Sequence, residues 1–315
     1  MNQKKQQEKL IFFDKAAFLL FKLFSLVLVL ISFILIVVII YFYFTFMLPM
    51  TASENIIIFT IQTTSAIWII WGISYNYVKA VFTKPGYPPP NLITKEELKQ
   101  LKKRYKLIKS NPHNSRALKK IPYCPICKNF KPERTHHDAL SGKCVLRMDH
   151  FCPWINNTVG YKNHKFFILF MVYLILGCIY AAILSSSAFF FDIGLSDHPV
   201  DHQGPLIFVF ITCLVVIIGV SFLVGFHFYL LLTNQTTIEF YQNQLPNPKS
   251  KKGKIRKFDL GKRKNFDQFF GTTNQYWFKF LFNFENPKGD GIHFIKAEKN
   301  LNYRYLNIGD SNVII

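Results

Sequence analysis

The segment Asp149-His150-Phe151-Cys152 carries two side chains whose spacing suits nucleophilic catalysis. An ionised cysteine is a strong nucleophile, and a neighbouring imidazole can accept its proton. In an extended strand, residues two apart point to the same face, so His150 and Cys152 would lie together; in a helix they would point apart. Asp149 could then orient the imidazole, as the third member of a triad does. The segment alone leaves two alternatives open, zinc ligation and ordinary packing.

A second group of residues has the spacing of a zinc site. Cys124-Pro-Ile-Cys127 is a CxxC pair, whose two thiolates can hold one tetrahedral ion from a tight turn. His136, His137 and Cys144 follow and are candidates for the two remaining ligands. Three cysteines and one histidine would form a closed site of the structural kind. Unliganded thiols in a loop are the alternative.

Four long uncharged segments must position these residues. The 315-residue chain is 50% hydrophobic yet has a net charge of +20, so apolar and basic residues are segregated along it. About 20 apolar residues suffice to cross a hydrocarbon core of ~30 Å, and each segment is that long. We therefore predict an all-α membrane protein with four transmembrane helices, and not a large soluble protein with buried helices. The segments are Leu23–Leu48, Ile56–Val78, Phe166–Phe191 and Leu206–Leu232.

The positions of the basic residues predict the orientation of the chain in the membrane. All 38 Lys and Arg residues lie before Leu23, between Lys79 and Lys165, or after Leu232. By the positive-inside rule, both termini and the central loop face the cytosol. A reducing compartment disfavours disulfides, so the loop cysteines are expected to serve metal binding or catalysis. Nucleic acid is not an expected partner, because no binding motif is present and flanking cations suit anionic lipid headgroups.

The loop resembles the cysteine-rich domain of the DHHC protein S-acyltransferases, the palmitoyltransferases, with the spacing of that family. Two later motifs extend the resemblance from about Ala16 to about Phe284: Thr236-Thr237-Ile238-Glu239 is similar to the TTxE motif, and Phe258-Asp259-Leu260-Gly261 with Asn265 and Gly271 resembles the C-terminal motif. The matching loop residues are Cys124-Pro-Ile-Cys127, Lys131-Pro132-Glu133-Arg134, His137, Cys144, Asp149-His150-Phe151-Cys152, Pro153-Trp154, Asn156-Asn157, Val159-Gly160, Asn163 and Phe166.

The resemblance implies a protein S-palmitoyltransferase. Such an enzyme moves a fatty acyl group from acyl-CoA, through an acyl-Cys152 intermediate, to membrane-proximal cysteines of substrate proteins. His150 would be the base, positioned by Asp149, which Thr237 would hydrogen-bond. Acyl-CoA would be the co-substrate. Asn265 would tether the tail, Gly177 would lie near the acyl-chain end and Trp154 near the thioester. The CoA phosphates need cations, for which the nearest candidates are Lys131, Arg134 and His136; simple solvation of a basic loop is the alternative for these three.

The chain departs from the family at the second of its two zinc sites. The first set survives as Cys124, Cys127, His137 and Cys144, but the second falls on Asp138, Ser141, Phe151 and Thr158. We expect one structural zinc, with Phe151 packing where a ligand would stand. Since the family's base is the first histidine of DHHC, Phe151 leaves His150 in place, as in fungal members with DHYC. Lys84 replaces the Asp of a frequent DPG motif, with no evident meaning.

The expected organisation has five parts: a cytosolic N-terminus (1–15), two transmembrane helices (16–82), a cytosolic loop (83–165) with the cysteine-rich domain at about 121–165, two further helices (166–232) and a cytosolic tail (233–315). The host membrane would be an endomembrane or the plasma membrane. One alternative is a non-catalytic membrane adaptor that displays a zinc domain; retention of Asp149, His150, Cys152 and Thr237 weighs against it. A membrane ubiquitin ligase of the RING type would need about eight zinc ligands, and the loop supplies too few.

Overall fold

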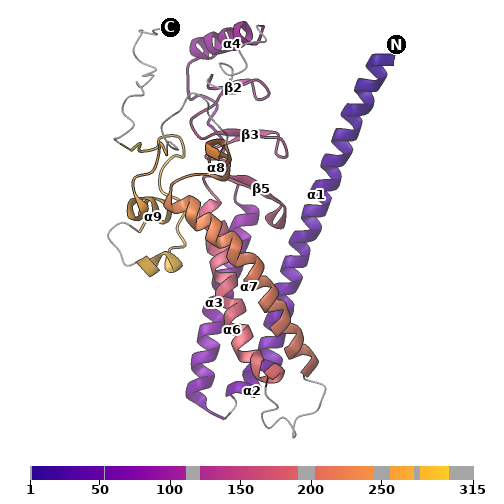
Figure 1. Cartoon of the computed structure of the whole chain (residues 1–315), viewed down its shortest axis with the longest axis vertical. Helices are drawn as coiled ribbons and strands as arrows, with labels where there is room; N and C mark the ends of the chain where they lie inside the picture. The colour runs from indigo at the N-terminus through magenta and orange to yellow at the C-terminus, as the bar shows by residue number, and fades with distance from the viewer. Residues whose placement is uncertain are drawn as a thin grey trace.

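The computed structural model describes residues 2–52, 54–110, 121–190, 203–244, 256–272 and 277–297, and the side chains of all of these except 2–16, 187–190, 203 and 277 (Figure 1). The end of the third predicted span at Phe191 and the last residues of the tail lie outside this part of the chain.

Four helical stretches are long and apolar enough to cross a membrane: Ala17–Ala52, Ile56–Phe82, His164–Ser186 and Gly204–Leu232. They confirm the four predicted spans and the multi-pass membrane architecture. Helices form here because a backbone in hydrocarbon must satisfy its own hydrogen bonds. The elements are α1 (Asn2–Phe42), the π-helical turn η1 (Tyr43–Met47), α2 (Leu48–Ala52), α3 (Ile56–Phe82), α6 (His164–Phe190) and α7 (Gln203–Leu232).

Helix α6 lies at the centre of the bundle, against α3 on one side and α7 on the other (Figure 1). A glycine permits the close approach of α3: a Cβ atom at Gly72 would stand 2.2 Å from the Tyr173 ring. Tyr173 is fully buried, and its hydroxyl donates a hydrogen bond of 2.5 Å to the Leu281 carbonyl in the tail. The bundle and the C-terminal tail are therefore joined through α6.

Three short antiparallel hairpins connect α3 to α6 and stand at one end of the bundle (Figure 1). Two-stranded sheets of this length are marginal by themselves, so other contacts must hold them. Helix α4 (Lys95–Lys109), closed at its N-terminus by a Thr94–Glu97 capping box, packs on the first hairpin. The strands are β1 (Tyr123–Cys124) with β2 (Asn129–Phe130), β3 (His136–Asp138) with β4 (Lys143–Val145), and β5 (His150–Cys152) with β6 (Asn157–Val159); the short 3-10 turn η3 (Pro153–Ile155) links the last two.

The third hairpin is fastened to the end of α3. The Asn157 amide donates hydrogen bonds of 2.9–3.2 Å to the carbonyls of Ala80, Val81 and Thr83, which have no helical partner at a C-terminus. The Tyr77 hydroxyl donates to the Trp154 carbonyl at 2.9 Å. These bonds fix the position of Cys152 relative to the bundle.

The chain after α7 folds back over the hairpins and the bundle through α8 (Thr237–Gln244), α9 (Lys262–Phe270) and the 3-10 helix η6 (Trp277–Phe282). Asn265 makes the expected tether: its amide donates to the Leu232 carbonyl at 2.8 Å, and its oxygen accepts from the Leu260 N–H at 3.0 Å. Phe270 and Phe280 are buried in the same hydrophobic cluster as α6.

Candidate active site and metal centre

Strand β5 places His150 and Cys152 on one face of the third hairpin. Its extended backbone pairs His150 with Val159 and Cys152 with Asn157, which confirms the strand that the two-residue spacing requires. Cys152 is buried in the hydrophobic cluster shared with α3 and α6, while the His150 side chain keeps 27% of its surface exposed. The thiol thus lies at the base of the hairpin, toward the bundle.

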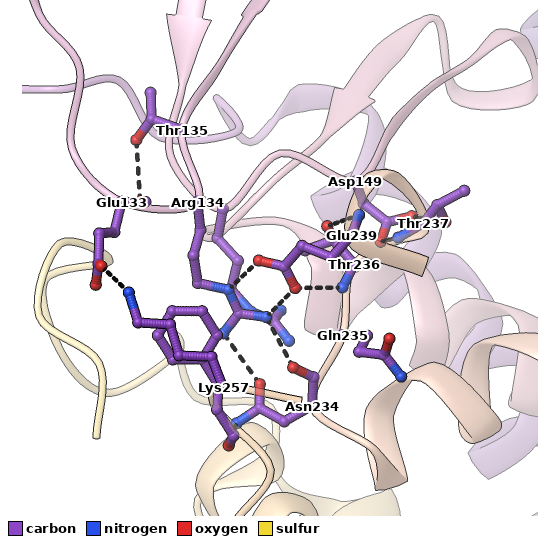
Figure 2. A network of polar contacts seen from close by, with 12 residues as sticks. Glu133, Arg134, Thr135, Asp149, Asn234, Gln235, Thr236, Thr237, Glu239 and Lys257 are labelled. Atoms are coloured by element: carbon purple, nitrogen blue, oxygen red, sulfur yellow. Dashed lines mark hydrogen bonds and ion pairs between the residues drawn. The ribbon is translucent and has the colours of Figure 1, made fainter. Parts of the chain in front are cut away.

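The Asp149 carboxylate connects this hairpin to helix α8. Its Oδ2 accepts hydrogen bonds from His150 Nδ1 and Thr237 Oγ1, both at 2.7 Å, and its Oδ1 accepts from the Thr237 N–H at 2.9 Å. Figure 2 shows the Thr237 side chain directed at Asp149. The structure therefore contains the expected Thr237–Asp149 hydrogen bond, and Asp149 also faces the positive end of a helix.

Burial alone would raise the pKa of Asp149, but the imidazole of His164 and the hydrogen bond from His150 outweigh it and hold that pKa well below its ordinary value. Burial would likewise lower the pKa of His150. The hydrogen bond to Asp149 and the interaction with Cys152 are stronger, and they raise the pKa of His150 to about 9. The imidazole is therefore basic enough to take a thiol proton, since an ordinary cysteine has a pKa near 8.5.

The first and last residues of the TTIE segment explain how α8 is held at this place. Thr236 and Glu239 form a reciprocal capping box: Thr236 Oγ1 accepts from the Glu239 N–H, and Glu239 Oε2 accepts from the Thr236 N–H. Glu239 also receives two hydrogen bonds from Arg134, at 2.7 and 2.8 Å (Figure 2). One helix start thus contacts both the second and the third hairpin.

Arg134 is held entirely within the protein. Its guanidinium donates further hydrogen bonds of 3.0 Å to the Asn234 side chain and carbonyl, and it stacks between the rings of Phe258 and Phe294 at 4.3 and 4.9 Å. With 7% of its surface exposed, the residue is a structural centre of the tail contact. This position does not suit the CoA phosphate contact expected from the sequence.

The other three residues expected near CoA remain accessible. Lys131, directly after the first hairpin, and His136, at the start of the second, are partly buried. The Trp154 side chain is 52% exposed, while its carbonyl is bonded to α3. Burial and the nearby charge of Lys131 lower the pKa of His136 to about 4, so that at neutral pH Lys131 is the cation among these three residues.

Four residues of the first two hairpins converge as a candidate metal centre. Cys124, Cys127, His137 and Cys144 each offer a ligand atom within 4.8 Å of the others. His137 Nδ1 lies 3.2 Å from Cys127 Sγ and 3.7 Å from Cys124 Sγ, and His137 pairs with Cys144 across the second hairpin. Three thiolates and one imidazole suit a tetrahedral structural zinc ion. Of the two neighbouring histidines, the structure brings only His137 into this group.

Comparison with known proteins places this geometry in a family. The family model for DHHC palmitoyltransferases matches residues 118–244, which contain all three hairpins and α8. Palmitoyltransferase ZDHHC20-B of Danio rerio is 32% identical over 253 residues, covering 76% of this chain and 74% of that protein. The chain belongs to the DHHC palmitoyltransferase family.

Other members of the DHHC family are similarly close. Palmitoyltransferase ZDHHC2 of Rattus norvegicus is 33% identical over 236 residues, and palmitoyltransferase ZDHHC15 of Xenopus laevis is 30% identical over 268 residues, which cover 70% and 78% of this chain. The aligned region spans 62% of the rat protein and 72% of the frog protein.

Hydrogen bonds link three of the residues at the positions where the family resemblance implies further zinc ligands, Asp138, Ser141 and Thr158. Thr158 Oγ1 donates to Asp138 Oδ2 at 2.6 Å, and the backbone N–H groups of Leu140 and Ser141 donate to the same carboxylate at 3.1 and 2.9 Å. Asp138 and Thr158 are both buried, so the carboxylate joins the second hairpin to the third. This bond joins two of the four positions where the family resemblance implies a second set of zinc ligands. The Phe151 ring contacts Phe21 of α1, with 5.7 Å between ring centroids.

Three buried polar residues near Asp149 were missed in the sequence: Arg147, His164 and His227. Arg147 donates to His164 Nδ1 at 3.2 Å, and the rings of His227 and His150 lie 5.5 Å apart. His227 did give a signal, because an ionisable residue within an apolar span is costly and commonly functional.

Replacing Thr158 by valine should weaken the domain. The change keeps the side-chain volume but removes the donor to Asp138, leaving a buried carboxylate short of one partner. We expect the free energy of unfolding to fall by about 1–3 kcal/mol, measured by denaturant titration of the detergent-solubilised protein. Thr158→Ser keeps the hydroxyl and should lose clearly less. Equal stability of the valine variant and the wild type would show that the bond does not support the fold.

Proposed function

We propose that this chain is a protein S-palmitoyltransferase that forms an acyl-Cys152 intermediate. The observation that carries the proposal is a pair of hydrogen bonds, from Thr237 to Asp149 and from His150 to Asp149. His150 lies on the same strand as Cys152. This arrangement orients a base toward a nucleophilic thiol. Family membership supports it, and the names of the relatives state the same reaction for those proteins.

In the first half-reaction, His150 holds the proton of Cys152 and the thiolate attacks the carbonyl carbon of the acyl-CoA thioester. The new sulfur–carbon bond forms, the bond to the CoA sulfur breaks, and CoA leaves as the thiol with the proton from His150. In the second, His150 accepts the proton of a substrate cysteine, whose sulfur attacks acyl-Cys152. The acylated substrate departs and the Cys152 thiolate is restored. Asp149 remains ionised throughout and orients the imidazole.

The bundle supplies an apolar environment for the acyl chain. Each methylene kept out of water is worth about 0.8 kcal/mol, so a long chain needs such a site. A cavity lies between the spans, and Ile69 and Ile73 of its wall also belong to the hydrophobic cluster that contains Cys152. Gly177 also lines the cavity, which supports the expectation that the end of the acyl chain lies near this residue. Other lining residues include Ile36, Ile40, Ala181 and Cys213.

Charge and topology complete the proposal. The basic segments before, between and after the spans support a cytosolic position for the hairpins and both termini, on an endomembrane or the plasma membrane. There Lys131, His136 and Trp154 would contact CoA, whereas Arg134 stabilises the tail. Substrates would be proteins with cysteines near the membrane surface, since Cys152 lies at the junction of hairpin and bundle.

The metal centre contributes stability to this arrangement. Zinc on Cys124, Cys127, His137 and Cys144 would join the first two hairpins, and structural zinc sites contribute to folding outright. We propose one ion per chain, because a hydrogen-bonded carboxylate occupies the other ligand positions.

The reaction can be tested with the purified protein and palmitoyl-CoA. The wild type should acquire a hydroxylamine-sensitive acyl group on Cys152, detected by mass spectrometry, and Cys152→Ser should not. Ser110→Ala, at the exposed C-terminal end of α4 and outside the lining of the cavity, is the control and should remain acylated. Because Asp149 keeps His150 protonated up to about pH 9, the thiolate is available at neutral pH and the wild-type rate should change little between about pH 7 and 9.

The variant His150→Ala should behave differently in the same assay. Without the imidazole that takes the proton of Cys152, less of the nucleophile forms, so acylation at pH 7 should be lower by about 10–100-fold and recover as the pH rises. A protein that never forms acyl-Cys152 would be an adaptor and not an enzyme.

Zinc content is a separate test. Elemental analysis of the purified wild type should give one zinc per chain, and Cys124→Ala should lose it together with most of the folded domain. Asp138→Asn should retain one zinc. A ratio of two, or a loss of zinc in Asp138→Asn, would contradict the assignment of a single site.

A further inference from the structure

A buried polar group adjoins the active site on its membrane side. Asp149, His164 and His227 are each at most 4% exposed, and they come from the third hairpin, α6 and α7. One ring nitrogen of each histidine and one carboxylate oxygen lie within 4.8 Å of one another. The mechanism proposed above uses Asp149 and leaves both histidines without a role.

Two imidazoles and a carboxylate could hold a metal ion, but the surroundings do not suit one. The Asp149 carboxylate already accepts three hydrogen bonds, from His150 and Thr237. Arg147 lies 3.2 Å from His164 Nδ1 and can only donate, so this nitrogen is an acceptor. A divalent ion would add two positive charges to a buried region that has one carboxylate and the cation of Arg147. The group is better suited to stabilising the Asp149 charge.

His227 is the member that contacts the reacting pair. Its ring lies 5.5 Å from the His150 ring, tilted by 36°, and 5.3 Å from Phe167 in an edge-to-face contact. Its Nδ1 atom is buried and has no hydrogen-bond partner among the described residues. A buried polar atom without a partner is unusual in a native protein and calls for an explanation. The proximity of His227 to Asp149 and His150 offers such an explanation.

We propose that His227 is a positioning residue for acyl transfer, whose uncharged imidazole gives buried Asp149 a polar neighbour from α7 and packs against His150. It thereby keeps Asp149 ionised and His150 protonated beside the Cys152 thiolate. Around this group the charged and titratable side chains are Asp149 and His150 of the third hairpin, Arg147 before it and His164 of α6. The inference rests on the proposed acyl transfer, because it assigns His227 a part in it.

Substitutions of His227 can distinguish the contribution of its ring nitrogens from that of the aromatic ring. His227→Phe keeps an aromatic ring, His227→Asn returns an amide near the Nδ1 position, and His227→Gln returns one near Nε2. The rate of Cys152 alkylation by iodoacetamide, followed on the Cys152 peptide over pH 6–10, reports the His150–Cys152 pair without acyl-CoA. For the Phe variant we expect about a tenfold slower reaction at pH 7 and a midpoint about one pH unit higher. The Asn variant should stay within threefold of the wild type, and Gln should be slower than Asn.

Acylation kinetics give a second measurement on the same proteins. His227→Phe should lower kcat for palmitoyl-CoA and leave KM unchanged, because the residue does not touch the substrate. Phe222→Leu changes a ring on the exposed face of the same helix and should match the wild type in both assays.

Two results would overturn the inference. The first is a wild-type pH profile for His227→Phe. The second is equally slow alkylation of the Phe, Asn and Gln variants with an unshifted midpoint, which would mean that His227 contributes only packing. If the Phe variant does not fold, Asn and Gln still decide, because equal rates for the two contradict a role for Nδ1. A wild type that alkylates normally but never forms acyl-Cys152 refutes the proposed function, while the alkylation series still tests His227.

Discussion

The arrangement of the hairpins and the tail depends on the buried carboxylate of Asp149. An ionised carboxylate is stable away from water only when donors and positive charge surround it. Here they come from His150 on the neighbouring position and from Thr237, 88 residues further along the chain. Because Thr237 begins α8, which follows directly on α7, the last membrane span must end beside the third hairpin. One charge thus sets the geometry of the catalytic group and the path of the tail.

The hairpins around this charge have too few strand pairs to hold themselves, and each is fixed from outside. The Cys3His group joins the first two, and Asp138 with Thr158 joins the second to the third. Buried Arg134 connects the second hairpin to α8, where removing one member of the ion pair would leave an uncompensated charge. Three separate contacts thus hold the hairpins, and one of them, between Asp138 and Thr158, uses two positions where the family resemblance implies zinc ligands. The hydrogen bonds that hold Asp149 come from His150 and Thr237, and not from Phe151.

Properties set by local sequence could be predicted, and those set by distant contacts could not. Uncharged runs define the spans because the bilayer demands them, and the spacing of His150 and Cys152 required the strand that β5 forms. The CxxC spacing left His136 and His137 both open as ligands, and the family resemblance implied His137, which is the one that lies with the three cysteines. Arg134 was expected near CoA because the CoA phosphates need cations. In the structure, Glu239 and Asn234, about 100 residues later in the chain, hydrogen-bond its guanidinium instead. His227 was missed because its role depends on which face of α7 meets the third hairpin.

The most direct test of the account is the acylation rate of Asp149→Asn at pH 7, measured in a single turnover with palmitoyl-CoA. Asparagine keeps the size of the side chain but cannot stabilise a protonated His150 with a full charge. We predict a loss of roughly 100-fold or more in a protein that still binds zinc and unfolds cooperatively. An asparagine variant that acylates Cys152 at the wild-type rate would contradict the central place given to this carboxylate.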